Sequence, residues 1–163
     1  MYLWKPLRQV NRNEPKERKM KIQFDDIETA FHFISMGPMY GNQAILCKET
    51  GDIFYISEMG DSDELPDDIE DSKKYIEIPH KNALDLGKNL VMRFVIEFMP
   101  DDIYRVENIF KRKGAYSRFK SLLEKEGLLK EWHDYENKWR VIALKDWCYD
   151  NKIGKFKLIS EKN

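Results

Sequence analysis

The fold of this chain is organised around residues 111–123, which read KRKGAYSRFKSLL. The segment joins the densest group of basic residues in the chain to a glycine and then to a helix-forming stretch. Because glycine breaks helices and readily takes positive φ, Gly114 is predicted to end one helix and open the next. Phe119, Leu122 and Leu123 then share one helical face. We expect the rest of the chain to pack against this segment or to balance its charge.

The C-terminal segment from Leu128 to about Ile153 predicts one long helix. Its large apolar residues recur at near-heptad spacing, which is typical of an amphipathic helix. They are Trp132, Tyr135, Trp139, Ile142, Ala143 and Trp147. Tryptophans on one helical face belong more often to a core than to a ligand cage. We therefore predict that the three indole rings face inward.

Three further helices are predicted before Gly114. The first carries Asp25 and Glu28 at the spacing of a capping box and stops at Gly37. The second runs over residues 82–99, where apolar residues share one face. The third restarts after Pro100 with two acidic residues, which suit the positive end of a helix dipole.

A small antiparallel sheet is predicted in the N-terminal half. Residues 43–57 read as a β-hairpin whose turn has Gly51 at a position that permits positive φ. Tyr75–Ile78 reads as a third short strand, ended by Pro79. The hairpin strands are apolar at consecutive positions, so both sheet faces should be at least partly covered. The predicted fold class is α+β, with this sheet packed against about five helices and a helical C-terminal half.

Length and composition indicate one domain. A chain of 163 residues can bury roughly 70% of its unfolded surface. We expect a single domain over residues 22–154, an N-terminal tail or extension over 1–21 and a polar tail over 155–163. No apolar run of about 18 residues or secretory segment is evident, and Cys47 and Cys148 lie far apart in the sequence. The expected location is the cytoplasm, away from membranes.

Charge is unevenly distributed along a chain whose net charge is only −1. Residues 49–71 hold ten acidic residues and no Lys or Arg, whereas residues 105–125 hold seven basic residues against two acidic ones. The two segments either face each other or remain solvated. The third interpretation is that the basic segment forms a binding surface.

Local motifs for metal, cofactor or nucleophilic chemistry are not evident. His32, His80 and His133 fall on separate predicted elements, without a zinc-binding spacing or a cysteine pair. Residues 61–64, DSDE, begin like a calcium loop, but that loop would need glycine at its sixth position and glutamate at its twelfth. No phosphate-binding glycine motif is present. We predict no metal and no cofactor; an enzyme whose site is assembled from distant residues stays an alternative.

The candidate binding residues surround Gly114. They are Lys111, Arg112, Lys113, Tyr116, Arg118 and Lys120. We favour a non-catalytic interaction or regulatory module that presents this basic, aromatic-edged surface to an unknown protein partner, because Arg and Tyr frequently anchor interfaces. The alternative is binding of RNA or DNA through Lys111–Lys120. Helix-start amides and cations would then hold a phosphate, and Tyr116 would stack on a base.

Several motifs occur in a characteristic order. They are the acidic-capped helix from Asp25, Glu49-Thr50-Gly51-Asp52, Tyr75-Ile76-Glu77-Ile78-Pro79, Gly114-Ala115-Tyr116-Ser117-Arg118-Phe119, Trp132, and Ala143-Leu144-Lys145-Asp146-Trp147. In this order the chain, from roughly Phe24 to Ile153, resembles an uncharacterised bacterial protein family of the UPF series. The family typically has phenylalanine where Tyr116 stands. The resemblance implies a small cytosolic α+β protein and carries no established activity, substrate or catalytic residue.

Overall fold

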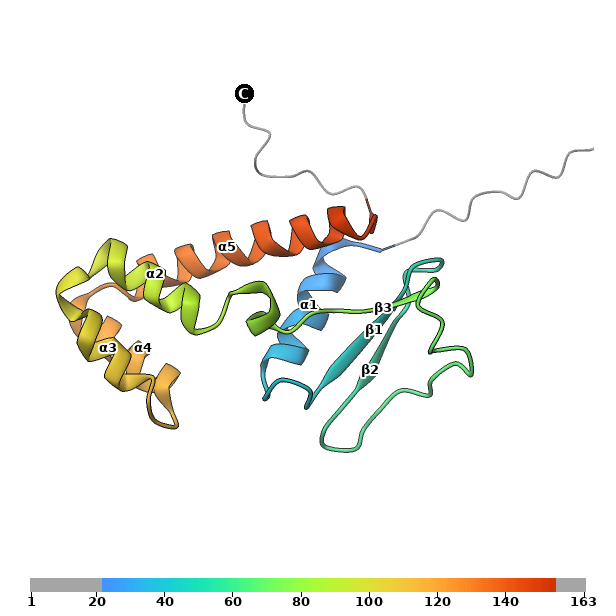
Figure 1. The fold of residues 1–163 in the computed structure, drawn as a ribbon, viewed down its shortest axis with the longest axis horizontal. Coiled ribbons are helices and arrows are strands. Elements are labelled where there is room, and N and C mark those ends of the chain that lie inside the picture. The colour runs from blue at the N-terminus through green and yellow to red at the C-terminus, as the bar shows by residue number, and fades with distance from the viewer. Residues whose placement is uncertain (1–21, 155–163) are drawn as a thin grey trace, which may run out of the picture.

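The computed structural model describes residues 22–154 (Figure 1). The predicted tails, residues 1–21 and 155–163, lie outside the described residues. The elements, in order, are α1 (Phe24–Ser35), β1 (Gln43–Cys47), β2 (Ile53–Ile56), β3 (Tyr75–Glu77), the 3-10 helix η1 (Lys81–Leu84), α2 (Lys88–Phe98), the 3-10 helix η2 (Pro100–Asp102), α3 (Ile103–Ile109), α4 (Ala115–Glu126) and α5 (Leu129–Asp150). This is the predicted α+β fold, with a helical C-terminal half.

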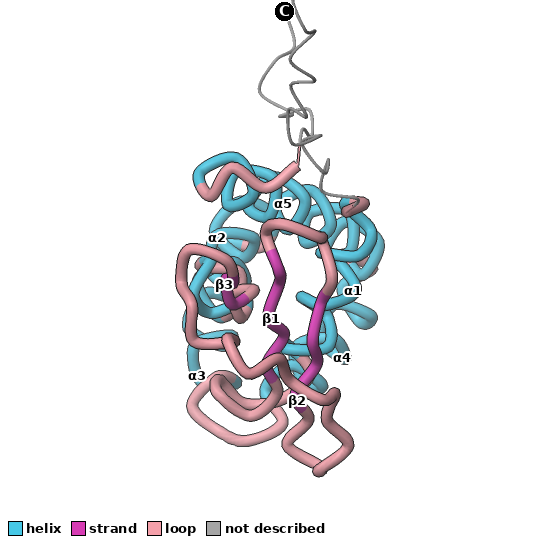
Figure 2. Tube along the Cα trace, turned by 90° about the vertical axis from the view of Figure 1, so that its right-hand side faces the viewer, coloured by secondary structure: helices cyan, strands magenta, loops and turns pink. Residues whose placement is uncertain are grey.

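The three strands form an antiparallel sheet in the order β2-β1-β3. The hairpin aligns Ile45 with Phe54, and Gly51 adopts a φ of 85° in its turn. Figure 2 shows the strands at one end of the molecule, in front of the helices. Ala44 of β1 is fully buried, and Phe33 of α1 contacts Tyr55 of β2 edge-on at 5.1 Å. One face of the sheet is therefore covered by α1.

The second face of the sheet is partly covered by the acidic connector, residues 58–74. Tyr75 is buried and its hydroxyl donates a hydrogen bond to Asp68 of the connector at 2.9 Å. Asp63 lies along the β2 edge, where its carboxylate accepts the Tyr55 N–H at 2.8 Å. All β2 residues are half-buried, which confirms the expectation that both sheet faces are at least partly covered.

The start of α1 corrects the predicted capping residues. Gln23, rather than Asp25, is the N-cap, and its N–H donates to the carboxylate of Asp26 at 3.0 Å. Asp26 is the third residue after this N-cap, which is the position from which an acidic side chain reaches back. Glu28 is thereby free to point toward α5, where the Arg140 Nε lies 3.4 Å from its Oε1.

The predicted helix over residues 82–99 is divided in two. Lys81–Leu84 forms η1, and the α-helix begins only at Lys88. Asp85 takes a left-handed conformation with φ 55° and ψ 27°, which interrupts the helical path. Aspartate tolerates this region better than most residues. A side chain at Gly87 would collide with Asn82, so the glycine permits the close return of η1 onto the start of α2.

The core of the helical half is built from aromatic rings of α2, α4 and α5. Phe94 and Trp132 lie edge-to-face with their ring centroids 5.3 Å apart, and Phe119 meets Trp132 at 5.2 Å. All three side chains are almost completely buried. Such aromatic pairs contribute about 0.5–1.5 kcal/mol beyond the area they bury. They fix the positions of α4 and α5 against α2.

The prediction that all three α5 tryptophans face inward is only partly right. Trp132 is 1% exposed, whereas Trp139 and Trp147 are half-buried. A straight α-helix falls about 20° short of two full turns in seven residues, so a near-heptad stripe rotates away from a flat contact. Trp139 accordingly lies at the edge of the core.

Candidate functional site

The predicted basic surface lies at the junction of α3 and α4. Gly114 is the N-cap of α4 and adopts a φ of 75°, so the chain turns sharply between the two helices. The five cations of the prediction are all exposed around this turn. They are Lys111, Arg112, Lys113, Arg118 and Lys120.

Two of these five cations donate side-chain hydrogen bonds, in both cases to a neutral group. Lys111 donates to the side-chain oxygen of Asn108 at 3.2 Å, and Arg118 donates to the carbonyl of Ile109 at 3.4 Å. Four salt bridges occur within residues 22–154, and none of them includes a member of the basic surface. The positive charge of the surface is therefore not neutralised by contacts within the described chain.

The acidic connector does not face this surface. Figure 1 places residues 58–74 beside the sheet at one end of the molecule, and α3 and α4 at the other end. The interpretation in which the two charged segments pair with each other is wrong for this structure. Both segments are instead solvated, each at its own end.

Tyr116 is packed at the base of the basic surface. The Lys81 ammonium lies 4.2 Å from the centre of its ring, and Phe110 meets the ring edge-on at 5.1 Å. Burial, and the negative charge of Glu136, raise the pKa of Tyr116. The aromatic residue of this region that is open to solvent is Tyr104 of α3, which is 81% exposed.

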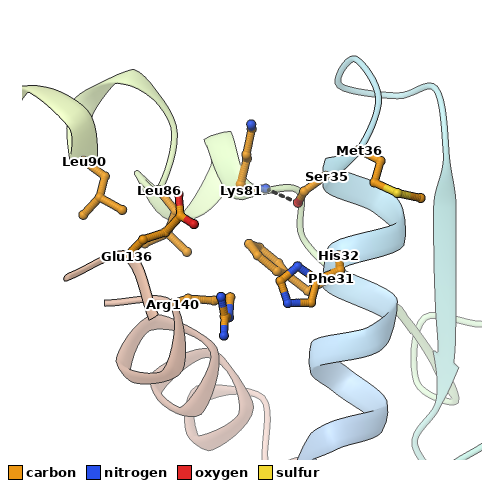
Figure 3. A pocket seen from close by; sticks show the side chains of 9 residues that line it. All are labelled: Phe31, His32, Ser35, Met36, Lys81, Leu86, Leu90, Glu136 and Arg140. Atoms are coloured by element: carbon orange, nitrogen blue, oxygen red, sulfur yellow. Dashed lines mark hydrogen bonds between the residues drawn. The ribbon is translucent and has the colours of Figure 1, made fainter. Parts of the chain in front are cut away.

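A second candidate site is a cavity of about 310 Å³ among α1, η1, α2 and α5 (Figure 3). It is lined by Phe31, His32, Ser35, Met36, Lys81, Leu86, Leu90, Glu136 and Arg140. Figure 3 shows Glu136 and Arg140 projecting from α5 toward η1 and α1. The cavity thus combines an apolar floor with charged side chains from separate elements.

The wall of the cavity is fixed by hydrogen bonds between η1 and the end of α1. The backbone N–H of Lys81 donates to the hydroxyl of Ser35 at 3.2 Å. The buried His80 places Nε2 3.1 Å from the carbonyl oxygen of Gly37, and its Nδ1 accepts the N–H of Asn82 at 3.1 Å. These two bonds assign the proton to Nε2 and make His80 a neutral structural residue.

The charged side chains of the cavity differ in whether they have an oppositely charged partner. Arg140 is bound to Glu28 through Nε and to Asn137 through Nη1. Lys81 has no carboxylate within salt-bridge distance among residues 22–154. Burial lowers the pKa of Lys81, an effect that Glu136 opposes and the nearby charge of Lys120 reinforces. A desolvated cation in a cavity is a frequent property of functional sites.

No local sequence pattern predicts this cavity. Its residues come from segments 31–36, 81–90 and 136–140, which carry no common local pattern. His32 is exposed at the cavity wall. The one sequence signal for this site is the pair Glu136 and Arg140. A carboxylate and a guanidinium four residues apart share a helical face.

Trp139 borders two more open surface hollows. One is lined by three acidic residues with Phe98, Tyr135, Lys138 and Trp139, and the other by residues of η1, α2 and α5. The Trp139 ring is already approached by Arg93 at 5.0 Å and by Lys138 at 5.4 Å. The described chain thus supplies its own cations to this ring.

Between residues 22 and 154, no three His, Cys, Asp or Glu side chains are grouped closely enough to hold a metal ion. Within the same range, no helix has the length and apolar character needed to cross a bilayer. Cys47 and Cys148 are both buried, and neither forms a disulfide.

Comparison with known proteins gives one match. Neither the curated proteins nor the solved structures include a significant match to this chain. A family model described as an uncharacterised protein family, UPF0158, matches residues 39–161. The matched region begins after α1, so the acidic-capped helix is not part of it, while the hairpin, β3, the α3–α4 junction and α5 are. The chain therefore belongs to the uncharacterised protein family UPF0158.

Proposed function

We propose that this protein is a non-catalytic interaction module that binds an acidic protein partner through the basic surface at the α3–α4 junction. The observation that carries the proposal is the absence of any salt bridge to its five exposed cations from within residues 22–154. An acidic surface on a partner would supply the missing counter-charges and would steer the encounter.

An exposed aromatic residue supports a protein partner. Tyr104 and Asn108 lie one helical turn apart on α3, and Lys111 is hydrogen-bonded to Asn108. Tyrosine and arginine are enriched among residues that dominate binding energy at protein interfaces. Tyr104 would bury its ring against the partner while Arg112 and Lys113 pair with carboxylates.

Nucleic acid is the alternative acidic partner, and two observations count against it. The ring of Tyr116 is half-buried and occupied by Lys81, so it is a poor platform for a base. The chain has a net charge of −1, whereas nucleic-acid-binding domains usually carry a basic excess.

The test compares two charge reversals with the same change in net charge. One variant carries Lys113→Glu and Lys120→Glu on the basic surface, and the control carries Lys73→Glu and Lys88→Glu outside it. All four lysines are exposed and make no salt bridge within the described chain. Tagged full-length protein captures partners from a nuclease-treated lysate, followed by quantitative mass spectrometry.

The expected result is a set of acidic proteins that the wild type and the control capture and the Lys113→Glu/Lys120→Glu variant loses. Equal capture by all three proteins would contradict the proposal. A duplex-DNA and single-stranded-RNA titration addresses the alternative. Nucleic acid would be favoured if the logarithm of the binding constant falls linearly with the logarithm of the salt concentration. For duplex DNA the expected slope is near −0.9 for each phosphate contacted.

A further inference from the structure

The cavity among α1, η1, α2 and α5 has an apolar floor that is separate from the basic surface. Phe31, Leu86 and Leu90 are buried and contribute this floor. At about 310 Å³, the cavity is near the lower end of the range for ligand pockets, roughly 300–1,000 Å³. Its size suits one small organic molecule with an aliphatic or aromatic group, rather than a nucleotide.

One cation at the cavity has unused capacity to bind an anion. Arg140 uses Nε and Nη1 for Glu28 and Asn137, and Nη2 makes no hydrogen bond to the residues that the structure describes. The Lys81 ammonium lies over the ring of Tyr116, which does not line the cavity, and Figure 3 shows the Lys81 side chain pointing away from Arg140. A carboxylate in the cavity would receive a charge-assisted hydrogen bond from Nη2 of Arg140.

One carboxylate at the cavity has unused capacity to bind a cation. Glu136 lies one helical turn before Arg140 on α5, so the two side chains share a face. No salt bridge within residues 22–154 includes Glu136. An ammonium group beside it would gain a direct ionic partner.

The mixture of charges restricts the class of ligand. A simple anion would be repelled by Glu136, and a simple cation would be repelled by Arg140. A ligand that carries both charges satisfies both groups at once. We propose that the cavity binds an amino-acid-like zwitterion, with its carboxylate toward Arg140, its ammonium toward Glu136, and an apolar side chain on Phe31, Leu86 and Leu90.

Isothermal titration calorimetry of the full-length protein tests this proposal. The zwitterions are L-leucine, L-methionine and L-phenylalanine; 4-methylpentanoate lacks the ammonium of leucine and 3-methylbutylamine lacks its carboxylate. Leucine, or one of the other two amino acids, is expected to bind at least roughly tenfold more tightly than either single-charge compound, because each lost charge-assisted hydrogen bond leaves a group unpaired. No binding by any of the three amino acids, or tighter binding of a single-charge compound, would overturn the proposal.

Two variants each remove one of the two charges that the ligand would meet. Glu136→Gln is expected to weaken zwitterion binding roughly tenfold without weakening 4-methylpentanoate, and Arg140→Met is expected to weaken zwitterion binding without weakening 3-methylbutylamine. Lys73→Met in the acidic connector, outside the cavity, is the control that leaves affinity unchanged. Unchanged affinity in both cavity variants would refute the proposal. Thermal melting checks that each variant is folded. A variant that reverses two other cations of the basic surface, Arg112→Glu/Lys113→Glu, retains zwitterion binding, which separates this site from the proposed partner surface.

Discussion

The ammonium of Lys81 lies 4.2 Å from the centre of the Tyr116 ring, so a cation of η1 rests on an aromatic face of α4. This contact connects two parts of the molecule with different properties. Tyr116 belongs to the helix that carries the basic surface, and Lys81 belongs to the wall of the cavity. The pair therefore couples the position of η1 to the start of α4.

Removing the aromatic face of Tyr116 should destabilise the fold more than removing its hydroxyl. Tyr116→Leu is expected to lower the free energy of unfolding by about 1–2 kcal/mol, because the contacts with Lys81 and Phe110 are lost. Tyr116→Phe keeps both contacts and should change it by less than about 0.5 kcal/mol. Urea denaturation measures both. Equal losses in the two variants would show that the hydroxyl, and not the ring, is important.

The tryptophans of α5 should differ in their contribution to stability. Trp132→Ala is expected to cost about 3–5 kcal/mol, as for other large buried aromatic residues. Trp139→Ala should cost less than about 2 kcal/mol, because that ring is half-buried and at the core edge. Chemical denaturation followed by far-UV circular dichroism gives both values. A Trp139 variant as unstable as the Trp132 variant would contradict the placement of Trp139.

Glycine should be required at position 114 because of its positive φ, and not because a larger side chain would collide with its surroundings. A Cβ there would meet only Arg118, at 3.9 Å, so the cost of Gly114→Ala comes from its φ of 75°. That cost is about 1–2 kcal/mol for a non-glycine residue. Gly37→Ala is the matched control, because Gly37 has no positive φ and equally open surroundings. Thermal melts should show a clear loss for Gly114→Ala and almost none for Gly37→Ala.

The contribution of the acidic connector to stability should fall at low pH, because Asp68 becomes protonated. Hydrogen bonds from Lys74, and then from Tyr75, hold the pKa of Asp68 below its ordinary value. A carboxylate whose folded pKa is lowered stabilises the fold above its unfolded pKa of about 3.9 and loses this effect as pH falls through the folded pKa. Asp68→Asn should therefore lower the melting temperature at pH 7 and have little effect near pH 2. A difference that persists at low pH would exclude this ionic contribution.

Cys148 should be unreactive until the protein unfolds. Burial raises the pKa of its thiol to about 12. At pH 8, roughly one molecule in ten thousand would carry the thiolate, compared with about a quarter in an unfolded chain. Mass spectrometry after brief iodoacetamide treatment should find Cys148 unmodified in the native protein and alkylated in guanidinium. Rapid native alkylation would mean that the C-terminal part of α5 opens readily.

The same thiol should make stability depend on pH in the alkaline range. Because its folded pKa is raised, its stabilising contribution is complete below the unfolded pKa of about 8.5 and is lost as pH rises toward 12. The free energy of unfolding of Cys148→Ala should therefore fall less steeply than that of the wild type above about pH 9. Parallel curves for the two proteins would contradict this.

The sequence was most informative where local chemistry alone determines the structure. Gly51 and Gly114 both adopt the positive φ that their turns require, and the hairpin and α4 were predicted correctly around them. The break between η1 and α2 was missed, because it depends on the conformation of Asp85 and on the contact between Asn82 and Gly87. Apolar periodicity continues through that break and gives no sign of it.

The cavity could not have been predicted for a different reason. His32, Lys81 and Glu136 are far apart in the chain and meet only when α1, η1 and α5 have packed. Each residue alone has an ordinary surface role. The five cations of the basic surface were visible because they are adjacent in sequence, whereas their lack of counter-charges became visible only in the structure.

The placement of the acidic connector and the basic surface at opposite ends has a consequence for handling the protein. A chain with a net charge of −1 would be expected to interact weakly with charged media. Separated blocks of opposite sign instead give residues 22–154 a large electric dipole moment. At low ionic strength it should be retained on both anion- and cation-exchange resins, each of which orients it by a different end.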